Sequence, residues 1–263
     1  MGASINPEPK VRSTRYKIAC GRAVGRSHTV TATPCQDYVA ARSARGIGCL
    51  ALADGAGSRS HSEIGAQEAV KATLRALSRN FDDLYTLALA DPAKVTTRIL
   101  EECRSAICKK ARLLQLEPDA FACTLMFVAH KDGRYLAGHL GDGVIAIEME
   151  QGTVEVLSHP DNGEYTNTTF FITESDAEAH FRIYTGVHSA PAFALMSDGT
   201  AESLYLRATR RPAGALLKLF QWTRELSKAK AEDILASNLV QVFGARTTDD
   251  CSIGLLTSST RSS

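Results

Sequence analysis

The chain has 263 residues, enough for one large domain or, as the less economical alternative, two small ones. Its hydrophobic content of 44% is ordinary for a globular protein with a real core, and its net charge of +1 gives no electrostatic basis for binding nucleic acid or a membrane surface. No apolar stretch approaches the roughly 18 residues of a membrane-spanning helix. Met1 to Arg15 lacks the apolar core of a signal peptide, so we expect a cytoplasmic protein without a membrane partner.

Seven cysteines occur without the paired Cys-x-x-Cys spacing of a zinc site, and most lie in apolar segments. They are Cys20, Cys35, Cys49, Cys103, Cys108, Cys123 and Cys251. We therefore expect buried, reduced thiols, with a zinc site as the weaker alternative.

The first half of the chain is predicted to place strands before two long helices. Residues 1–14 contain two prolines and mixed charge, which is typical of a disordered lead. Strands are predicted over 15–24, 37–44 and 48–53. A helix follows with Ser62 as its N-cap, since apolar residues then recur at helical spacing. A second helix is expected after Asp91-Pro92, where Asp suits the cap and Pro the first turn.

The second half is predicted to form an antiparallel meander, a long loop, two more helices and a last strand. Strands are expected over 121–129, 135–140, 144–150, 153–157, 180–187, 193–197 and 251–257. Asp132-Gly133 marks a hairpin turn, and the polar residues 158–180 indicate a surface loop. Helices are expected over 214–226 and 231–243, the second ending at Gly244.

Helices thus come in pairs between blocks of antiparallel strands. This order predicts an α+β layered domain and argues against an alternating parallel sheet. Helix pairs that cover sheets on both sides would give four layers. The predicted domain spans residues 15–257, between the lead 1–14 and a tail over 258–263.

Acidic residues stand at an edge of four separate apolar, strand-like segments. Asp54, Asp142 and Asp198 are each followed by glycine, and Asp249-Asp250 opens the last strand. Strand ends bring side chains from distant parts of the sequence around one point, where several carboxylates repel unless a cation neutralises them. The pattern predicts a hard divalent metal site with oxygen ligands, Mg2+ or Mn2+.

Each position also has a plain structural interpretation. Asp54 could belong to a tight turn, Asp37 to a turn before a strand, Asp142 to a hairpin, and Asp249-Asp250 to a solvated turn. The segment Asp198-Gly199-Thr200 invites comparison with haloacid-dehalogenase-type phosphatases. Those enzymes need Asp-x-Asp-Gly-Thr, and Met196 stands where the first Asp is required, so that interpretation fails.

In their order and spacing, five motifs resemble those of metal-dependent protein phosphatases of type 2C. They are Gln36-Asp37, Asp54-Gly55-Ala56-Gly57, Gly141-Asp142, Ser197-Asp198-Gly199 and Asp249-Asp250-Cys251-Ser252. The resemblance covers nearly the whole chain. Gly25-Arg26-Ser27-His28, followed by Pro34-Cys35-Gln36-Asp37, is similar to a bacterial subgroup with Ser-His and Pro-Cys-Gln-Asp motifs.

The resemblance implies a four-layer α-β-β-α sandwich, with a central antiparallel β-sandwich flanked by helix pairs, and a centre of two Mn2+ or Mg2+ ions. Carried over by position, Asp54 bridges both metals and the Gly55 carbonyl binds one of them. Asp198 and Asp249 bind the other side of the centre. Asp249 is preferred over its neighbour Asp250 because the family pattern is Asp-(Asn/Asp)-x-Thr, with Ser252 in place of Thr.

Two further acids have supporting roles by the same resemblance. Asp37 orients metal-bound water, and Asp142 matches the position that helps hold a third metal in bacterial members. The implied reaction is hydrolysis of phosphoserine or phosphothreonine in a protein by a metal-activated water, with no covalent intermediate. The expected partners are phosphoprotein substrates, such as a cognate kinase or its targets, and the expected state is a monomer.

The chain departs from the family pattern at places that concern the substrate. Ala32 stands where many members carry a phosphate-binding Arg, so Arg26 or His28 is predicted to substitute, with a structural histidine as the equal alternative for His28. Ala56 replaces the acid histidine of eukaryotic members. Residues 158–180 correspond to a flap near the active site, in which Asn162-Gly163-Glu164-Tyr165 would contact substrate or form a solvated loop.

Two alternatives to the enzyme remain. Ala32 motivates a non-catalytic module that binds phosphoproteins on the same fold, although a complete ligand set argues against it. A metal-dependent phosphodiesterase or nuclease is disfavoured by the near-neutral charge.

Overall fold

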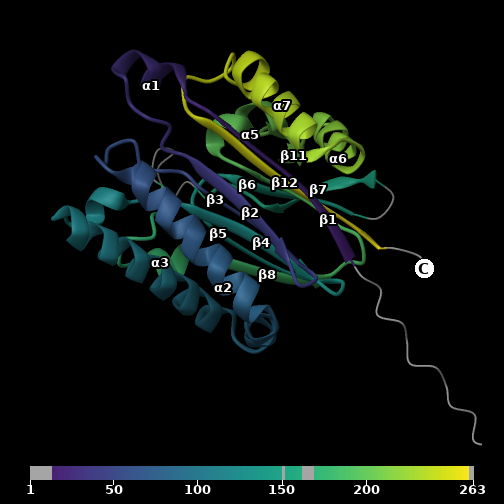
Figure 1. Cartoon of the computed structure of the whole chain (residues 1–263), viewed down its shortest axis with the longest axis horizontal. Helices are drawn as coiled ribbons and strands as arrows, with labels where there is room; N and C mark the ends of the chain where they lie inside the picture. The colour runs from purple at the N-terminus through teal and green to yellow at the C-terminus, as the bar shows by residue number, and fades with distance from the viewer. Residues whose placement is uncertain (1–13, 150–151, 162–168, 261–263) are drawn as a thin grey trace, which may run out of the picture.

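The computed structural model describes residues 14–149, 152–161 and 169–260, in which two five-stranded antiparallel sheets pack face to face (Figure 1). The first sheet, in spatial order, consists of β1 (Thr14–Ala23), β12 (Cys251–Thr260), β9 (Ala192–Met196), β6 (Val144–Glu148) and β7 (Val154–Ser158). The second consists of β2 (Tyr38–Ala44), β3 (Ile47–Ala53), β4 (Leu125–Lys131), β5 (Arg134–Leu140) and β8 (Arg182–Val187).

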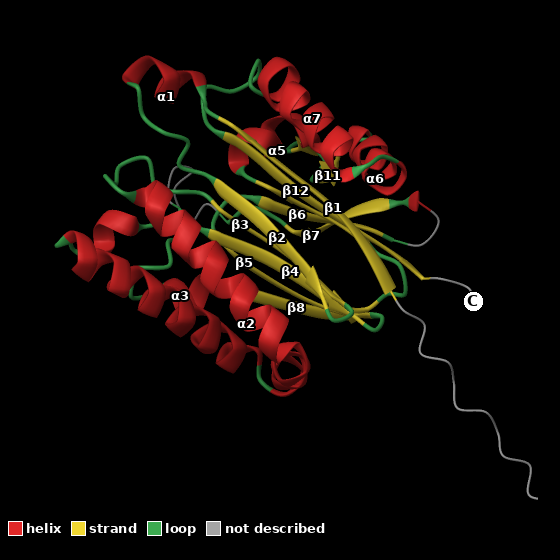
Figure 2. Cartoon of the chain, in the orientation of Figure 1, coloured by secondary structure: helices red, strands yellow, loops and turns green. Residues whose placement is uncertain are grey.

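Pairs of helices cover the outer faces of both sheets (Figure 2). The helices α2 (Ser62–Ala90) and α3 (Pro92–Leu114) lie on the second sheet, and α6 (Ala215–Glu225) and α7 (Lys228–Asn238) lie on the first. The prediction of an α+β, four-layer α-β-β-α sandwich is therefore confirmed. None of the described helices is both long and apolar enough to cross a membrane.

Shorter elements fill the connections between the layers. They are α1 (Arg26–Thr31), α4 (Ala177–His180), α5 (Asp198–Leu204), a 3-10 turn (Pro118–Phe121), a π-helical turn (Leu239–Phe243) and the strands β10 (Tyr205–Leu206) and β11 (Arg211–Pro212). All seven cysteines are free thiols; four are buried and Cys20, Cys35 and Cys108 are partly exposed.

Strand β3 explains how the middle of the molecule is built. All seven of its residues are buried, because successive side chains point to opposite faces and both faces are covered. Cys49 and Ala51 pack in the layer under α2 and α3, while Leu50 and Leu52 pack between the two sheets. A strand that is buried on both faces requires a continuous apolar run. Asp54 directly follows this run.

The predicted meander over residues 121–157 is wrong beyond β5. Strand β5 pairs with β4 and β8, whereas β6 pairs with β7 and β9 in the other sheet. The chain changes sheets at Gly141-Asp142-Gly143. Gly141 has φ +115°, and a Cβ there would lie 2.6 Å from Thr124 Cγ2, so the crossing depends on glycine. Short connections between strands suggested hairpins, but local spacing carries no information about which sheet the next strand joins.

Both long helices start close to their predicted positions, with different caps. His61, and not Ser62, occupies the N-cap of α2; Ser62 is the first helical residue and its Oγ accepts a hydrogen bond from Gln36 Nε2 at 2.8 Å. Asp91 does occupy the N-cap of α3, but its side chain makes no capping hydrogen bond. The C-cap of the π-helical turn is Gly244, as expected, with right-handed backbone angles.

Several predicted boundaries shift for tertiary reasons. Strand β12 continues to Thr260 in place of ending at residue 257, because Ser258 pairs with Tyr16 and donates to the Pro191 carbonyl at 2.9 Å. Strand β4 begins at Leu125, after the 3-10 turn. The 158–180 segment is not wholly on the surface, since Ile172 is fully buried. Residues 1–13 and Asn162–Tyr165 lie outside the described residues.

Candidate metal centre

Asp54 is fixed by its backbone at the end of β3. Its N–H donates to Thr124 Oγ1 at 2.9 Å, and its carbonyl accepts the Thr124 N–H at 2.8 Å. The next residue, Gly55, donates its N–H to the Gln36 carbonyl at 3.2 Å. A Cβ on Gly55 would lie 2.8 Å from both Gln36 O and Ser62 Cβ. Glycine therefore lets three segments meet beside Asp54.

Asp198 stands at the junction between β9 and α5. Its Oδ1 accepts the N–H of Gly199 at 2.6 Å. The preceding residue, Ser197, joins β9 to β12: its N–H donates to the Ser252 carbonyl at 3.0 Å, and its Oγ accepts the Ser252 N–H at 2.9 Å. The helix that begins at Asp198 was not predicted, although a serine before an acidic first turn is a usual start signal.

Asp142 and Asp249 approach the same region from other elements. Asp142 lies where the chain crosses between sheets, and its Oδ2 accepts a hydrogen bond from Thr169 Oγ1 at 2.7 Å. Asp249 is exposed and lies two residues before the start of β12. Its negative charge raises the pKa of Asp54, Asp142 and Asp198, so all four acids lie within electrostatic reach of one another.

Asp37 is the most deeply buried of the predicted site acids, at 1% exposure. Neither of its carboxylate oxygens has a hydrogen-bond partner among the described residues. Burial raises the pKa of Asp37 to about 6, and the charge of Asp250 adds to this effect, while the nearby hydroxyls of Ser252 and Ser197 oppose it. A buried carboxylate without partners is costly unless something else satisfies it.

The acids of the site disfavour one another's charge. Burial raises the pKa of Asp54 well above its usual range, and Asp37, Asp198, Asp142 and Asp249 raise it further. Burial, followed by the charges of Asp142 and Asp249, raises the pKa of Asp198 to about 7. A divalent cation would relieve this repulsion, and oxygen donors alone suit Mg2+ or Mn2+. The residues therefore fit a hard-cation site.

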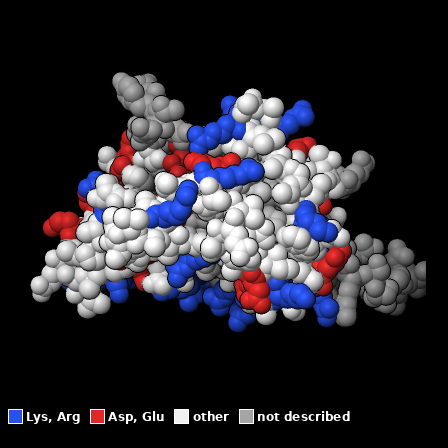
Figure 3. Space-filling model, turned by 90° about the horizontal axis from the view of Figure 1, so that it is seen from above, with Lys and Arg blue, Asp and Glu red and all other residues white. Residues whose placement is uncertain are grey.

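The acids lie in one region but do not form a preformed coordination site. Within residues 14–149, 152–161 and 169–260, no three His, Cys, Asp or Glu side chains form a ready-made ligand cluster. On the upper face of the molecule, acidic side chains gather near the middle with basic side chains on both sides (Figure 3).

The predicted substrate residues Arg26 and His28 both belong to α1 and turn toward the segment before β12. Arg26 Nη2 donates to the Thr247 carbonyl at 3.0 Å, and His28 Nδ1 lies 3.0 Å from Asp250 Oδ1. Ala32, at the C-cap of α1, has φ +55° and offers no polar side chain.

An arginine that the sequence reasoning did not single out lies beside Asp37. Arg22, at the end of β1, donates from Nη1 to the Asp37 carbonyl at 3.2 Å and stacks over Tyr38 at 5.4 Å. Only the return of the chain from α1 to β2 brings these residues together, so no local signal could have identified it.

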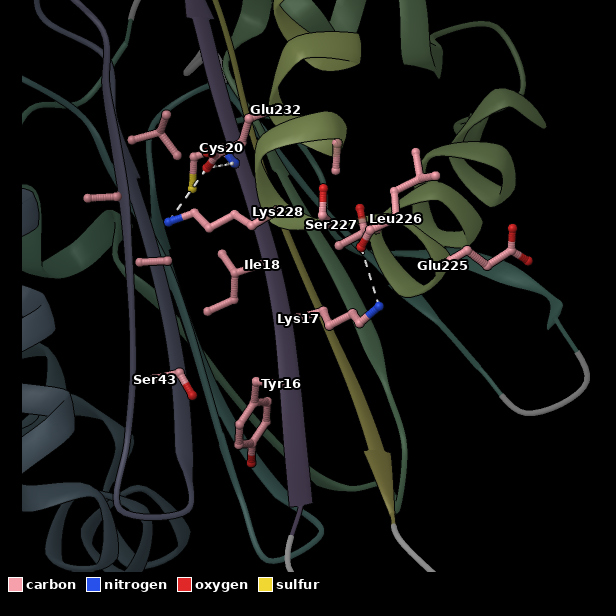
Figure 4. A pocket seen from close by; sticks show the side chains of 15 residues that line it. Tyr16, Lys17, Ile18, Cys20, Ser43, Glu225, Leu226, Ser227, Lys228 and Glu232 are labelled. Atoms are coloured by element: carbon pink, nitrogen blue, oxygen red, sulfur yellow. Dashed lines mark hydrogen bonds and ion pairs between the residues drawn. The ribbon is translucent and has the colours of Figure 1, made fainter.

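A cavity of about 690 Å3 lies elsewhere, between β1, β2 and the α6–α7 connection (Figure 4). Its polar groups largely satisfy one another: Lys17 Nζ donates to the Leu226 carbonyl at 3.3 Å, and Glu232 Oε1 accepts the Cys20 N–H at 3.3 Å. None of the predicted site acids lines it. We assign it no part in the chemistry.

The sequence pattern of the family described as Protein phosphatase 2C matches residues 24–243. The chain therefore belongs to the protein phosphatase 2C family. A curated relative, serine/threonine-protein phosphatase 3 of Escherichia coli strain K12, is 29% identical over 189 residues, which cover 70% of this chain and 73% of the relative.

Solved structures of low sequence identity share the fold. PppA of Pseudomonas aeruginosa, described as a regulatory component of T6SS, has a TM-score of 0.60 at 16% identity, covering 94% of this chain and 98% of that one. The S. agalactiae serine/threonine phosphatase has a TM-score of 0.59 at 16% identity, with 92% and 99% covered. The catalytic domain of the phosphatase PstP, solved with two manganese ions, has a TM-score of 0.58 at 18% identity, with 93% and 98% covered.

Proposed function

We propose that this member of the 2C family is a metal-dependent serine/threonine protein phosphatase that hydrolyses phosphomonoesters by attack of an activated water. One observation carries the proposal: acids from separate elements gather in a buried region, where Asp37 and Asp198 both disfavour the charge of Asp54, and Asp37 also disfavours the charge of Asp198. A fold would not retain such an arrangement for stability alone, since buried like charges are destabilising.

The proposed centre holds two Mn2+ or Mg2+ ions, and Asp142 would help to hold a third. Asp54 and the Gly55 carbonyl would bind from the end of β3, Asp198 from the start of α5, and Asp249 from the start of β12. When bound, the cations supply Lewis-acid chemistry that lowers the pKa of a water and neutralises charge developing on the phosphoryl group.

The chain's own residues set the geometry of this centre. The two hydrogen bonds that the Asp54 backbone makes with Thr124 hold Asp54 in place, and the Ser197–Ser252 bonds hold the starts of α5 and β12 together. Asp37 has two oxygens free of described partners with which to orient a water. Arg26 and His28 remain the proposed substrate contacts, and Arg22, which donates to the Asp37 carbonyl, is a further cation next to Asp37.

The proposed substrates are phosphoserine and phosphothreonine proteins, such as a cognate kinase or its targets. The proposed setting is the cytoplasm, and the proposed state is a monomer. The name of the Escherichia coli relative supports the substrate class. A non-catalytic phosphoprotein-binding module is the alternative that Ala32 motivates, but all five predicted acids are present, which favours catalysis.

The function is tested by hydrolysis of p-nitrophenyl phosphate and of phosphoserine and phosphothreonine peptides with added Mn2+. We expect turnover by the wild type and a loss of about 100-fold or more in Asp198→Asn, because one carboxylate fewer faces the cations. Asp233→Asn, at an exposed position of α7, is the matched control and should retain full activity.

The wild-type assay and the Asp198→Asn assay test different claims, the first the enzymatic activity and the second the site assignment. A well-folded wild type without Mn2+-dependent turnover would contradict the enzyme and favour the binding module. Wild-type activity in Asp198→Asn would contradict the site assignment while leaving the enzyme intact.

A further inference from the structure

The segment 25–36, which contains α1, leaves the sandwich after β1 and returns to it before β2. No residue of α1 is buried, and Figure 1 shows this helix beyond the ends of the strands. A cavity of about 350 Å3 separates the start of the segment from the π-helical turn, and one of about 510 Å3 lies between Pro34-Cys35 and the start of α2. Apolar packing therefore does not hold this segment in place, and its position must depend on polar contacts. The middle of the segment is held by Ser27, which donates from its N–H and its Oγ to the Thr248 carbonyl at 3.0 and 2.7 Å, and by Arg26 through the Thr247 carbonyl.

One carboxylate supplies contacts at both ends of the segment. Asp250 Oδ1 accepts the N–H of Gly25 at 2.6 Å, and Asp250 Oδ2 accepts the N–H of Gln36 at 2.6 Å. His28 Nδ1 lies 3.0 Å from Oδ1. Asp250 is 2% exposed, and its two oxygens accept these bonds away from competing solvent. The first and last residues of the segment are thus attached to the same side chain.

The same side chain is linked by short paths to three proposed site residues. Gln36 directly precedes Asp37, and its carbonyl accepts the Gly55 N–H at 3.2 Å. Asp250 directly follows Asp249. Gly25 is in backbone contact with that residue, since a Cβ on Gly25 would lie 2.4 Å from the Asp249 carbonyl carbon. Movement of the 25–36 segment would therefore displace site residues on both of its sides.

We propose that Asp250 is a positioning residue, whose carboxylate closes the 25–36 segment against β12 and so sets Asp37, Arg26 and His28 relative to the metal centre. This proposal rests on the proposed function and assigns a role to the acid of the Asp249-Asp250 pair that is not a proposed ligand. Because α1 contributes nothing to the core, the role concerns local order and cation binding more than global stability.

The test compares Asp250→Ala, Asp250→Asn and the control Asp233→Asn. The first readout is hydrogen–deuterium exchange of the metal-free proteins. We expect exchange in peptides covering 24–37 to accelerate about tenfold in Asp250→Ala, the effect of losing about one net hydrogen bond. Asn keeps the volume and one acceptor oxygen, so Asp250→Asn should show a smaller acceleration. Peptides from β3 and β4 should exchange as in the wild type.

The second readout is Mn2+ affinity by calorimetry, with KM and kcat measured at saturating Mn2+. We expect the Kd for Mn2+ and the KM for p-nitrophenyl phosphate to rise about tenfold in Asp250→Ala, with a smaller change in kcat and partial rescue in Asp250→Asn. The control should match the wild type in every measurement.

Wild-type exchange over 24–37 in Asp250→Ala would overturn the proposal. So would faster exchange with unchanged Mn2+ affinity and unchanged KM, because the carboxylate would then have a structural role alone. If Asp250→Ala does not fold, the exchange over 24–37, the Mn2+ affinity and the KM of Asp250→Asn test the proposal in its place. A wild type that binds Mn2+ but has no phosphatase turnover would contradict the proposed function. The positioning role of Asp250 would still be tested by hydrogen–deuterium exchange and by Mn2+ affinity.

Discussion

Two adjacent aspartates show how much the surroundings of a residue decide. Asp249 is exposed and acts on the other site acids through its charge, whereas Asp250 is buried and its two oxygens accept backbone N–H groups. The sequence preferred Asp249 as the ligand only through the resemblance to a family pattern. The buried hydrogen bonds supply an independent physical reason why Asp250 is not available to a cation.

The buried acids predict an unusual pH dependence of the metal-free protein. Burial raises the pKa of Asp37 from 3.8 to about 6, so the folded state binds more protons than the unfolded state between these values. Stability that is fully present below about pH 4 is therefore lost as the pH rises through about 6. A shift of this size corresponds to about 3 kcal/mol from Asp37.

Thermal or urea unfolding of Asp37→Asn in chelator checks this expectation. Asn carries no charge, so the variant should be more stable than the wild type at pH 8, with a difference that shrinks toward pH 4. The wild type should also gain more stability from Mn2+ at pH 8 than at pH 5. A variant less stable than the wild type at pH 8 would show that the buried carboxylate is already satisfied without a cation.

At the level of elements, the site lies where the ends of several strands and the start of a helix meet. The end of β3, the starts of α5 and β12 and the residue before β2 each supply one acid, and the crossing from β5 to β6 supplies another. Gly55 is a close contact in this junction because it touches both the chain before β2 and the start of α2.

Gly55→Ala should therefore disturb the site through the backbone. The added Cβ would lie 2.8 Å from Gln36 O and Ser62 Cβ, so these segments must move apart. We expect a loss of about 1–3 kcal/mol in unfolding free energy and a fall of about 10-fold or more in kcat/KM. Gly214→Ala is the matched control, since it meets nothing within 4 Å and has right-handed backbone angles. Equal behaviour of the two variants would contradict this account of the junction.

At the scale of the whole molecule, stability and chemistry occupy different parts of the sandwich. Three apolar layers, two under the helix pairs and one between the sheets, hold the strands whose ends carry the acids. Leu256 is fully buried between the sheets, seven residues along β12 from Asp249.

Leu256→Ala should lower stability without changing the chemistry of the folded molecule. A buried Leu→Ala substitution costs about 2–5 kcal/mol, measurable by urea unfolding. Activity per folded molecule at low temperature should stay within about twofold of the wild type, since the site is roughly 20 Å away along the strand. Leu89→Ala, 64% exposed on α2, should leave both quantities unchanged. A large loss of kcat in folded Leu256→Ala would show that core and site are coupled.

The sequence by itself determined the features that depend on neighbouring residues. The apolar run of β3, the amphipathic helices, the Asp132-Gly133 turn, whose residues both have positive φ, and the acids at strand ends could all be predicted. Helix pairs between strand blocks likewise predicted the layers. These patterns are local because periodicity and turn chemistry act over a few residues.

Only the tertiary structure decided which distant segments meet. Strand β1 pairs with β12 across the whole chain, and β6 joins β9 in place of β5, although every residue of β6 is buried and its pattern shows no preferred partner. The burial of Asp37, the contact of Arg22 with it and the attachment of the 25–36 segment to Asp250 follow from these pairings. Strand pairing is settled by burial and hydrogen bonding between remote residues, and no short stretch of sequence contains that information.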